Sequence, residues 1–156
     1  MANKADYYSN MGSFKQVRGD LKGAIVDYKK AIKANPKERE ALTNMGIALY
    51  SQGKISEAIK AFQKAVKIDP GNMNAYYNLG QIFKSRGEYQ CALDAFDKVI
   101  VINPNYVQAH NARGLVFVAQ KRFDEAVEAF KKALTVNPKF VAAYINLRDV
   151  LKKQGK

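Results

Sequence analysis

The sequence has no tryptophan, one cysteine (Cys91) and one histidine (His110) among its 156 residues. A single cysteine excludes an internal disulfide framework and is typical of a reducing compartment. One histidine and one cysteine supply neither a zinc-type ligand set nor a nucleophile with a base and an orienting group. We therefore expect no metal site, no cofactor and no catalytic residue, and we predict that the protein is not an enzyme.

Long apolar runs are also missing. No stretch approaches the roughly 20 apolar residues that a membrane-spanning helix needs. The first ten residues, MANKADYYSN, lack the apolar core of a signal peptide. We therefore expect a cytoplasmic protein.

Acidic residues are scarce, with 14 Asp and Glu against 26 Lys and Arg, so the formal net charge is +12. Only six of the cations are arginine, the residue preferred for bidentate phosphate and base contacts. A lysine-rich surface favours solubility or loose attraction to an acidic partner. Stacking aromatic residues are not interleaved with the lysines, so nucleic acid is not an expected partner.

Proline is rare but regularly spaced. The four prolines stand 34 residues apart, and three further columns keep the same step. Between Asn74 and Pro104, apolar residues recur every three or four positions on both sides of Gly87, which predicts two helices joined by a tight turn. The four columns are Gly12, Gly46, Gly80 and Gly114; Ala24, Ala58, Ala92 and Ala126; Tyr28, Phe62, Phe96 and Phe130; and Pro36, Pro70, Pro104 and Pro138.

In these columns the sequence resembles the tetratricopeptide repeat family, whose pattern has this period. The resemblance implies an all-α fold, a right-handed α-solenoid of antiparallel helix pairs with a carboxyl-terminal capping helix. It places the repeats at 5–38, 39–72, 73–106 and 107–140 and the capping helix at 141–154, within one domain, 1–156. The chain stops where another second helix would begin, so a longer array is an alternative.

In this family the first helix of each repeat lines a concave groove. Asn10, Asn44, Asn78 and Asn146 share one position in four of the five first helices. An amide both donates and accepts hydrogen bonds, so a row of amides suits the backbone of an extended peptide. The alternative is that asparagine is simply common at this position. The resemblance adds Tyr50, Tyr77, Gln81, Lys84, Asn111 and Leu115 to the predicted groove. We predict an adaptor or scaffold that binds another protein or peptide there.

Two surfaces indicate an alternative function. Tyr7 and Phe14 stand in the first repeat where later repeats have small residues, so the pair is either an exposed contact for a second copy of the chain or folded over its own helix. The second helices carry most of the lysines, which form a solvated outer face or a contact for an anionic membrane or an acidic protein. The alternative is therefore a self-assembling scaffold on an anionic membrane or organelle surface.

The fourth repeat departs from the pattern. His110 and Arg113 replace the usual aromatic residue and leucine, and we expect both to be partly exposed, with the stem of Arg113 packed. The alternative is a polar patch with Asp94 and Asp97. Lys121 stands where the earlier turns have glycine, which predicts a strained or differently shaped turn.

Overall fold

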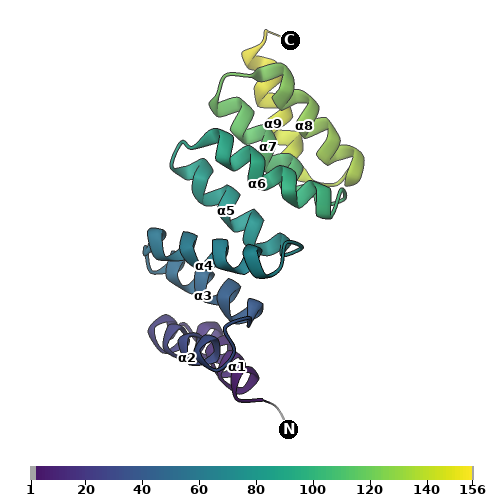
Figure 1. Cartoon of the computed structure of the whole chain (residues 1–156). Helices are drawn as coiled ribbons and strands as arrows, with labels where there is room; N and C mark the ends of the chain where they lie inside the picture. Colours follow the sequence, from purple (N-terminus) through teal and green to yellow (C-terminus); the bar gives the residue numbers. More distant parts are fainter. Residues whose placement is uncertain (1–2, 156) are drawn as a thin grey trace. The chain divides into compact units, whose positions relative to one another are not determined.

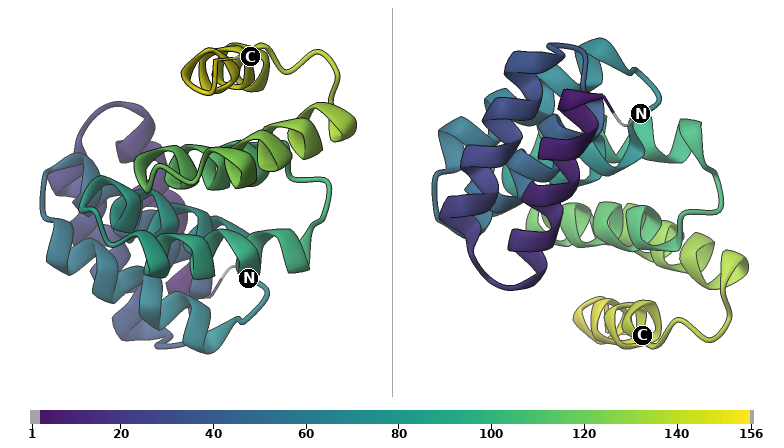
Figure 2. Two further views of the ribbon diagram at one scale, coloured as in Figure 1. Left: turned by 90° about the horizontal axis from the view of Figure 1, so that it is seen from above. Right: turned by 90° about the horizontal axis from the view of Figure 1, so that it is seen from below.

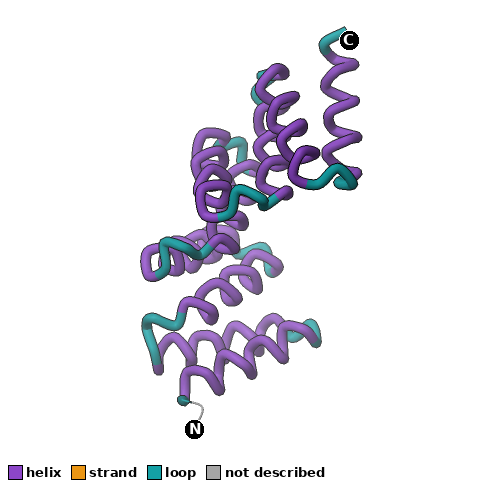
Figure 3. The backbone as a smooth tube through the Cα atoms, turned by 90° about the vertical axis from the view of Figure 1, so that its right-hand side faces the viewer, coloured by secondary structure: helices purple, strands orange, loops and turns teal. Residues whose placement is uncertain are grey.

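The computed structural model describes residues 3–155, which form helices joined by short loops, with no strand among them (Figures 1 and 3). The all-α class predicted from the sequence is confirmed. Across these residues the helices are α1 (Lys4–Val17), α2 (Leu21–Ala34), α3 (Arg39–Ser51), α4 (Ile55–Ile68), α5 (Met73–Ser85), α6 (Tyr89–Ile102), α7 (Val107–Ala119), α8 (Phe123–Val136) and α9 (Val141–Lys153).

The even-numbered helices end in the same way. Each is followed by an Asn or Asp that precedes a proline, and the backbone N–H of that residue donates to the carbonyl four residues back. Its side-chain Oδ1 then accepts from the backbone N–H two residues on, at 2.9–3.1 Å. This Asx turn satisfies the side chain while proline prevents the helix from continuing. The four residues are Asn35, Asp69, Asn103 and Asn137.

The turn within each pair of helices needs a left-handed backbone. Gly19, Gly53 and Gly87 adopt φ values of 82°, 74° and 74°. Lys121 adopts φ 60° at the equivalent place, so the turn keeps its shape. The conformation is strained there because, unlike glycine, lysine has a Cβ atom that lies close to the backbone. Of the two outcomes expected from the sequence, a strained turn or a differently shaped one, the structure shows the first.

Glycine and the aromatic ring of the next helix fit together at the centre of each pair. A Cβ atom added to Gly46 would lie 2.7 Å from Cε1 of Phe62, and one added to Gly12 would lie 2.6 Å from Cε1 of Tyr28. Tyr28 and Phe62 are completely buried. The glycine column therefore exists because the ring occupies the space of a side chain.

The chain divides into two compact units, Met1–Asn78 and Leu79–Lys156, with the division inside α5. In the first unit, α1 packs beside α2 and α3 beside α4 (Figure 2). The rings of Tyr28 and Phe62 are buried between these helices. In the second unit, α8 packs against both α7 and α9, around the buried ring of Phe130.

Candidate functional site

The first unit contains a polar pocket of about 470 Å³. It is built from the amino-terminal half of α3, the loop after α4 and the first turn of α5. We call it the polar pocket; its lining residues are Arg39, Glu40, Thr43, Asn44, Asp69, Gly71, Asn72, Met73 and Asn74.

Hydrogen bonds between side chains fix one wall of the polar pocket. The Asn72 amide donates to Oγ1 of Thr43 at 2.9 Å, and that hydroxyl donates to the Arg39 carbonyl at 2.8 Å. Arg39 also forms an ion pair with Asp69 at 3.2 Å. Oδ1 of Asn72 accepts from the Ala75 backbone N–H at 3.0 Å, so the same residue caps α5. These bonds hold the wall in place before any ligand arrives.

The predicted asparagine row is partly engaged within the chain. Asn10 lies exposed on α1, whereas the half-buried Asn44 amide lies 3.5 Å from Oγ of Ser13. The Asn78 amide donates to the Asn74 carbonyl at 2.8 Å, one turn back on α5. Each such bond uses one of the two amide hydrogens and leaves the carbonyl oxygen able to accept.

In the second unit, two predicted groove residues contact one another. The Asn146 amide on α9 donates to Oδ1 of Asn111 on α7 at 2.9 Å. Leu115, one turn further along α7 from Asn111, is half-buried. The structure therefore brings these amides together as a pair between neighbouring first helices.

The remaining predicted site residues are Tyr50, Tyr77, Gln81 and Lys84. Tyr50 is 41% exposed near the end of α3. Tyr77, Gln81 and Lys84 lie on α5 and are half-buried. Burial lowers the pKa of the Lys84 ammonium group, because the charged form loses solvation.

Arg39, Asp69 and Asn72 line the polar pocket but were not among the site residues predicted from the sequence. Asn72 could have been recognised from the sequence as a helix-capping residue, because it stands just before the expected first helix of the third repeat. The ion pair of Arg39 with Asp69 joins residues 30 apart and has no local signal.

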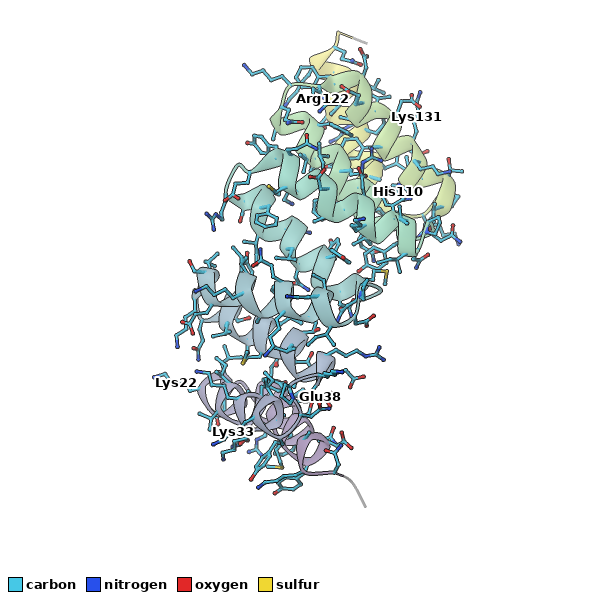
Figure 4. The ribbon with its side chains drawn as sticks, viewed as in Figure 1. Lys22, Lys33, Glu38, His110, Arg122 and Lys131 are labelled. Atoms are coloured by element: carbon cyan, nitrogen blue, oxygen red, sulfur yellow. The ribbon has the colours of Figure 1, made fainter. Side chains whose placement is uncertain are left out.

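The expectation of partial exposure was wrong for His110 on α7, which is labelled in Figure 4. Its exposed fraction is 3%. Its Nε2 lies 2.8 Å from the Pro104 carbonyl, which allows the ring to be buried. Arg113 is partly exposed, with its guanidinium 5.4 Å from the centre of the Phe117 ring. It also pairs with Asp97 at 3.0 Å, one of the two alternative partners.

Across residues 3–155, no cluster of three or more His, Cys, Asp or Glu side chains is arranged to hold a metal ion. No helix in the described part of the chain is long and apolar enough to cross a membrane.

Comparison with protein-family models identifies the repeats. The model of the TPR repeat matches residues 18–53, 46–85 and 80–121, and the model of the tetratricopeptide repeat matches residues 107–140. The chain belongs to the tetratricopeptide repeat (TPR) family. TPR repeats generally form a non-catalytic helical-repeat fold that binds other proteins or peptides.

Solved structures agree with this assignment. One crystal structure of the MamA protein is 33% identical, covers 99% of this TPR chain and 85% of its own, and has a TM-score of 0.90. Another MamA crystal structure is 34% identical, with 92% and 84% of the two chains covered and a TM-score of 0.86. MamA from Desulfovibrio magneticus RS-1 is 25% identical, with 99% and 88% covered and a TM-score of 0.89. A search of curated proteins found no match.

Proposed function

We propose that this TPR chain is a protein-interaction adaptor or scaffold that binds an extended peptide or protein segment along its first helices. The main support is the polar pocket, where Asn44 lies beside a wall already ordered by Asn72, Thr43 and Arg39. A wall that is fixed beforehand loses little conformational freedom on binding, so association costs less entropy on this side.

The chemistry of the surface favours recognition of a peptide backbone. Asn44 and Asn78 offer amide groups that accept and donate, as peptide N–H and C=O groups require. Tyr50 and Tyr77 offer apolar ring surface with a polar tip, which is typical of interfaces. The Lys84 ammonium, partly desolvated, adds a charge that gains from contact with an acceptor.

The test is the double substitution Asn44→Ala with Asn78→Ala, measured on a peptide that has been selected from a random library for binding to the unaltered chain. Two lost hydrogen bonds of about 1 kcal/mol each predict affinity weaker by about tenfold or more. Neither substitution should unfold the chain, because alanine is a better helix former than asparagine.

A matched control replaces two exposed amides away from the first helices, Gln63→Ala with Asn105→Ala. This control should leave the affinity unchanged. Equal affinity of the Asn44 and Asn78 variant and the unaltered chain would remove the asparagine row from the proposal.

A second candidate function is self-association into a surface scaffold. Tyr7, Phe14 and Val17 on α1 are 57%, 56% and 88% exposed, and their spacings of seven and three place them along one helix face. An exposed apolar strip of this kind is typical of an interaction surface. The lysines of the even-numbered helices would then contact an anionic membrane or organelle surface.

A further inference from the structure

A pocket of about 310 Å³ opens in the first unit on the side of α2, α3 and α4. Its floor is apolar and recessed: Leu42 is 1% exposed, Ala61 is 4% exposed, and Ile32 and Met45 are half-buried. Its rim carries Lys29, Lys60 and Lys64, with Glu57 as the only acidic lining residue. We call this the lysine pocket.

The rim lysines do not take part in the ion pairs of the described residues. Within residues 3–155, no ion pair involves Lys29, Lys60, Lys64 or Glu57. A second hollow of about 670 Å³ shares Lys64 and adds Lys37, Lys67, Pro36 and Ile68. The two hollows together present five lysines and one carboxylate over apolar surface.

The same position two repeats later is also hollow but differs in charge. In the second unit a pocket of about 650 Å³ includes Ile100, Glu125, Ala129 and Lys132, each 68 residues after its counterpart in the lysine pocket. Asp97 and Glu128 stand at the positions that correspond to Lys29 and Lys60. The positive rim is therefore a property of the lysine pocket rather than of the repeat.

Charges in this second pocket, the arginine pocket, are already paired. Arg113 pairs with Asp97, and Arg122 pairs with Glu125. Both guanidinium groups also lie over the Phe117 ring, at 5.4 and 4.6 Å from its centre. Counting all its charged lining residues, the arginine pocket has three cations and three carboxylates, whereas the lysine pocket has three cations and one.

We propose that the lysine pocket is a docking site, separate from the first-helix surface, for an acidic amphipathic segment of a partner protein. An aliphatic side chain of the partner enters the pocket between Leu42, Met45 and Ala61. Flanking carboxylates contact Lys29, Lys60 and Lys64, which form no ion pair within residues 3–155.

The recessed floor of the lysine pocket favours a protein segment over a membrane surface as the binding partner. A protein that binds the bilayer surface inserts protruding Leu, Phe or Trp side chains among the lipids. Here Leu42 and Ala61 are buried beneath the lysines, so the apolar surface receives a side chain rather than inserting one. The volume also matches a single aliphatic side chain with room for its neighbours.

The probe is a fluorescein-labelled synthetic peptide of about ten residues in which central leucines are flanked by glutamates, and binding is measured by fluorescence anisotropy. Lys60→Glu with Lys64→Glu should weaken binding by about tenfold or more at about 150 mM salt. Both side chains are exposed, so the fold should persist, and circular dichroism checks this. Unchanged affinity of this variant would overturn the proposal.

The matched control is Lys139→Glu with Lys153→Glu, which changes the net charge equally; both residues are exposed in the second unit, and neither lines the lysine pocket. It should weaken binding by less than about twofold, because exposed distant charges are screened. An equal loss in both variants would show attraction to net charge alone and overturn the proposal.

Two further arms test the partner's chemistry. A peptide with serine in place of each leucine should bind about tenfold more weakly, and equal binding would overturn the apolar part of the site.

Vesicles of phosphatidylserine and phosphatidylcholine should not bind through these lysines. Vesicle binding that is lost in Lys60→Glu with Lys64→Glu, without peptide binding, would overturn the proposal in favour of a membrane. Asn44→Ala with Asn78→Ala should leave peptide binding here intact, which separates this site from the proposed function.

Discussion

At the scale of single residues, the helix pairs depend on a glycine that faces an aromatic ring. The ring of Phe62 occupies the space that a side chain at position 46 would fill. Phe62 is completely buried and surrounded by packed neighbours, so the ring has little freedom to move aside.

Gly46→Ala should therefore destabilise the chain. Alanine is intrinsically better than glycine in a helix by about 1 kcal/mol, so an unhindered site would gain stability. Overpacking against Phe62 costs about 1–3 kcal/mol, and we expect a net loss of about 1 kcal/mol in the free energy of unfolding by urea.

The double variant Gly46→Ala with Phe62→Leu isolates the clash. Leucine is smaller than phenylalanine, so the added methyl group should cost less in this background than alone. A stabilised Gly46→Ala single variant would contradict the explanation for the glycine column.

The sequence predicted this level of structure well because each column has a local cause. Glycine gives space or a left-handed turn, proline stops a helix, and Asn35 and Asp69 form Asx turns with residues two positions on. Lys121 shows the limit of such reasoning. The sequence predicted a strained or a differently shaped turn there, and only the structure shows that the backbone keeps the left-handed conformation, at φ 60°.

At the scale of helices, α1 and α2 are joined by a buried carboxylate. Asp27 on α2 is 3% exposed and pairs with Lys15 on α1 at 2.6 Å and with Lys30 at 3.4 Å. Burial alone would raise the pKa of Asp27, but the hydrogen bond and charge of Lys15, with those of Lys30, lower the pKa below its ordinary value.

Asp27→Asn should lower the free energy of unfolding by about 1–2 kcal/mol at pH 7, since both lysines are partly exposed and screened. A carboxylate with a lowered pKa stabilises the folded state fully above its unfolded value of about 3.9. That contribution is lost as the pH falls through the lower folded value. The two proteins should therefore converge in stability in acid below about pH 4.

Urea denaturation at a series of pH values measures this difference. Glu57→Gln serves as the control, because Glu57 is exposed and has no ion pair within residues 3–155. A stability difference for Asp27→Asn that persists unchanged at pH 3 would exclude the ion pair as its cause.

Side-chain contacts between different helices could not be predicted from the sequence. Thr43 with Asn72 and Asn111 with Asn146 join residues 29 and 35 apart, and their meeting depends on side-chain rotamers and on the exact packing of neighbouring helices. His110 illustrates the same limit. Its ring can be buried because Nε2 lies within hydrogen-bond distance of the Pro104 carbonyl, and Pro104 belongs to a loop whose path is set by packing.

At the scale of the whole molecule, the net charge of +12 opposes association between copies. The exposed strip of Tyr7, Phe14 and Val17 favours it. Salt screens repulsion between copies but leaves apolar attraction, so any association through the strip should strengthen as ionic strength rises.

Sedimentation at several protein concentrations and salt levels tests the second candidate function. The average mass should rise with concentration above the 17.4 kDa of one chain. Tyr7→Ser with Phe14→Ser should keep it near that value, because the strip loses its rings.

The control Val101→Ser with Tyr144→Ser removes exposed apolar groups on α6 and α9 and should associate like the unaltered chain. A single mass of one chain under every condition would remove self-association from the candidate functions.

The difference in charge between the lysine pocket and the arginine pocket affects the register in which a ligand can bind. The helices repeat every 34 residues, so a ligand could in principle bind in a neighbouring register, but Lys29 and Lys60 are replaced by Gln63 and Asp94 one period later. A shift of two periods would move an acidic segment from Lys29 and Lys60 to Asp97 and Glu128, where the positive charge of the rim is missing. If the lysine pocket binds an acidic segment as proposed, the unequal charge of the two pockets would fix the register in which that segment binds.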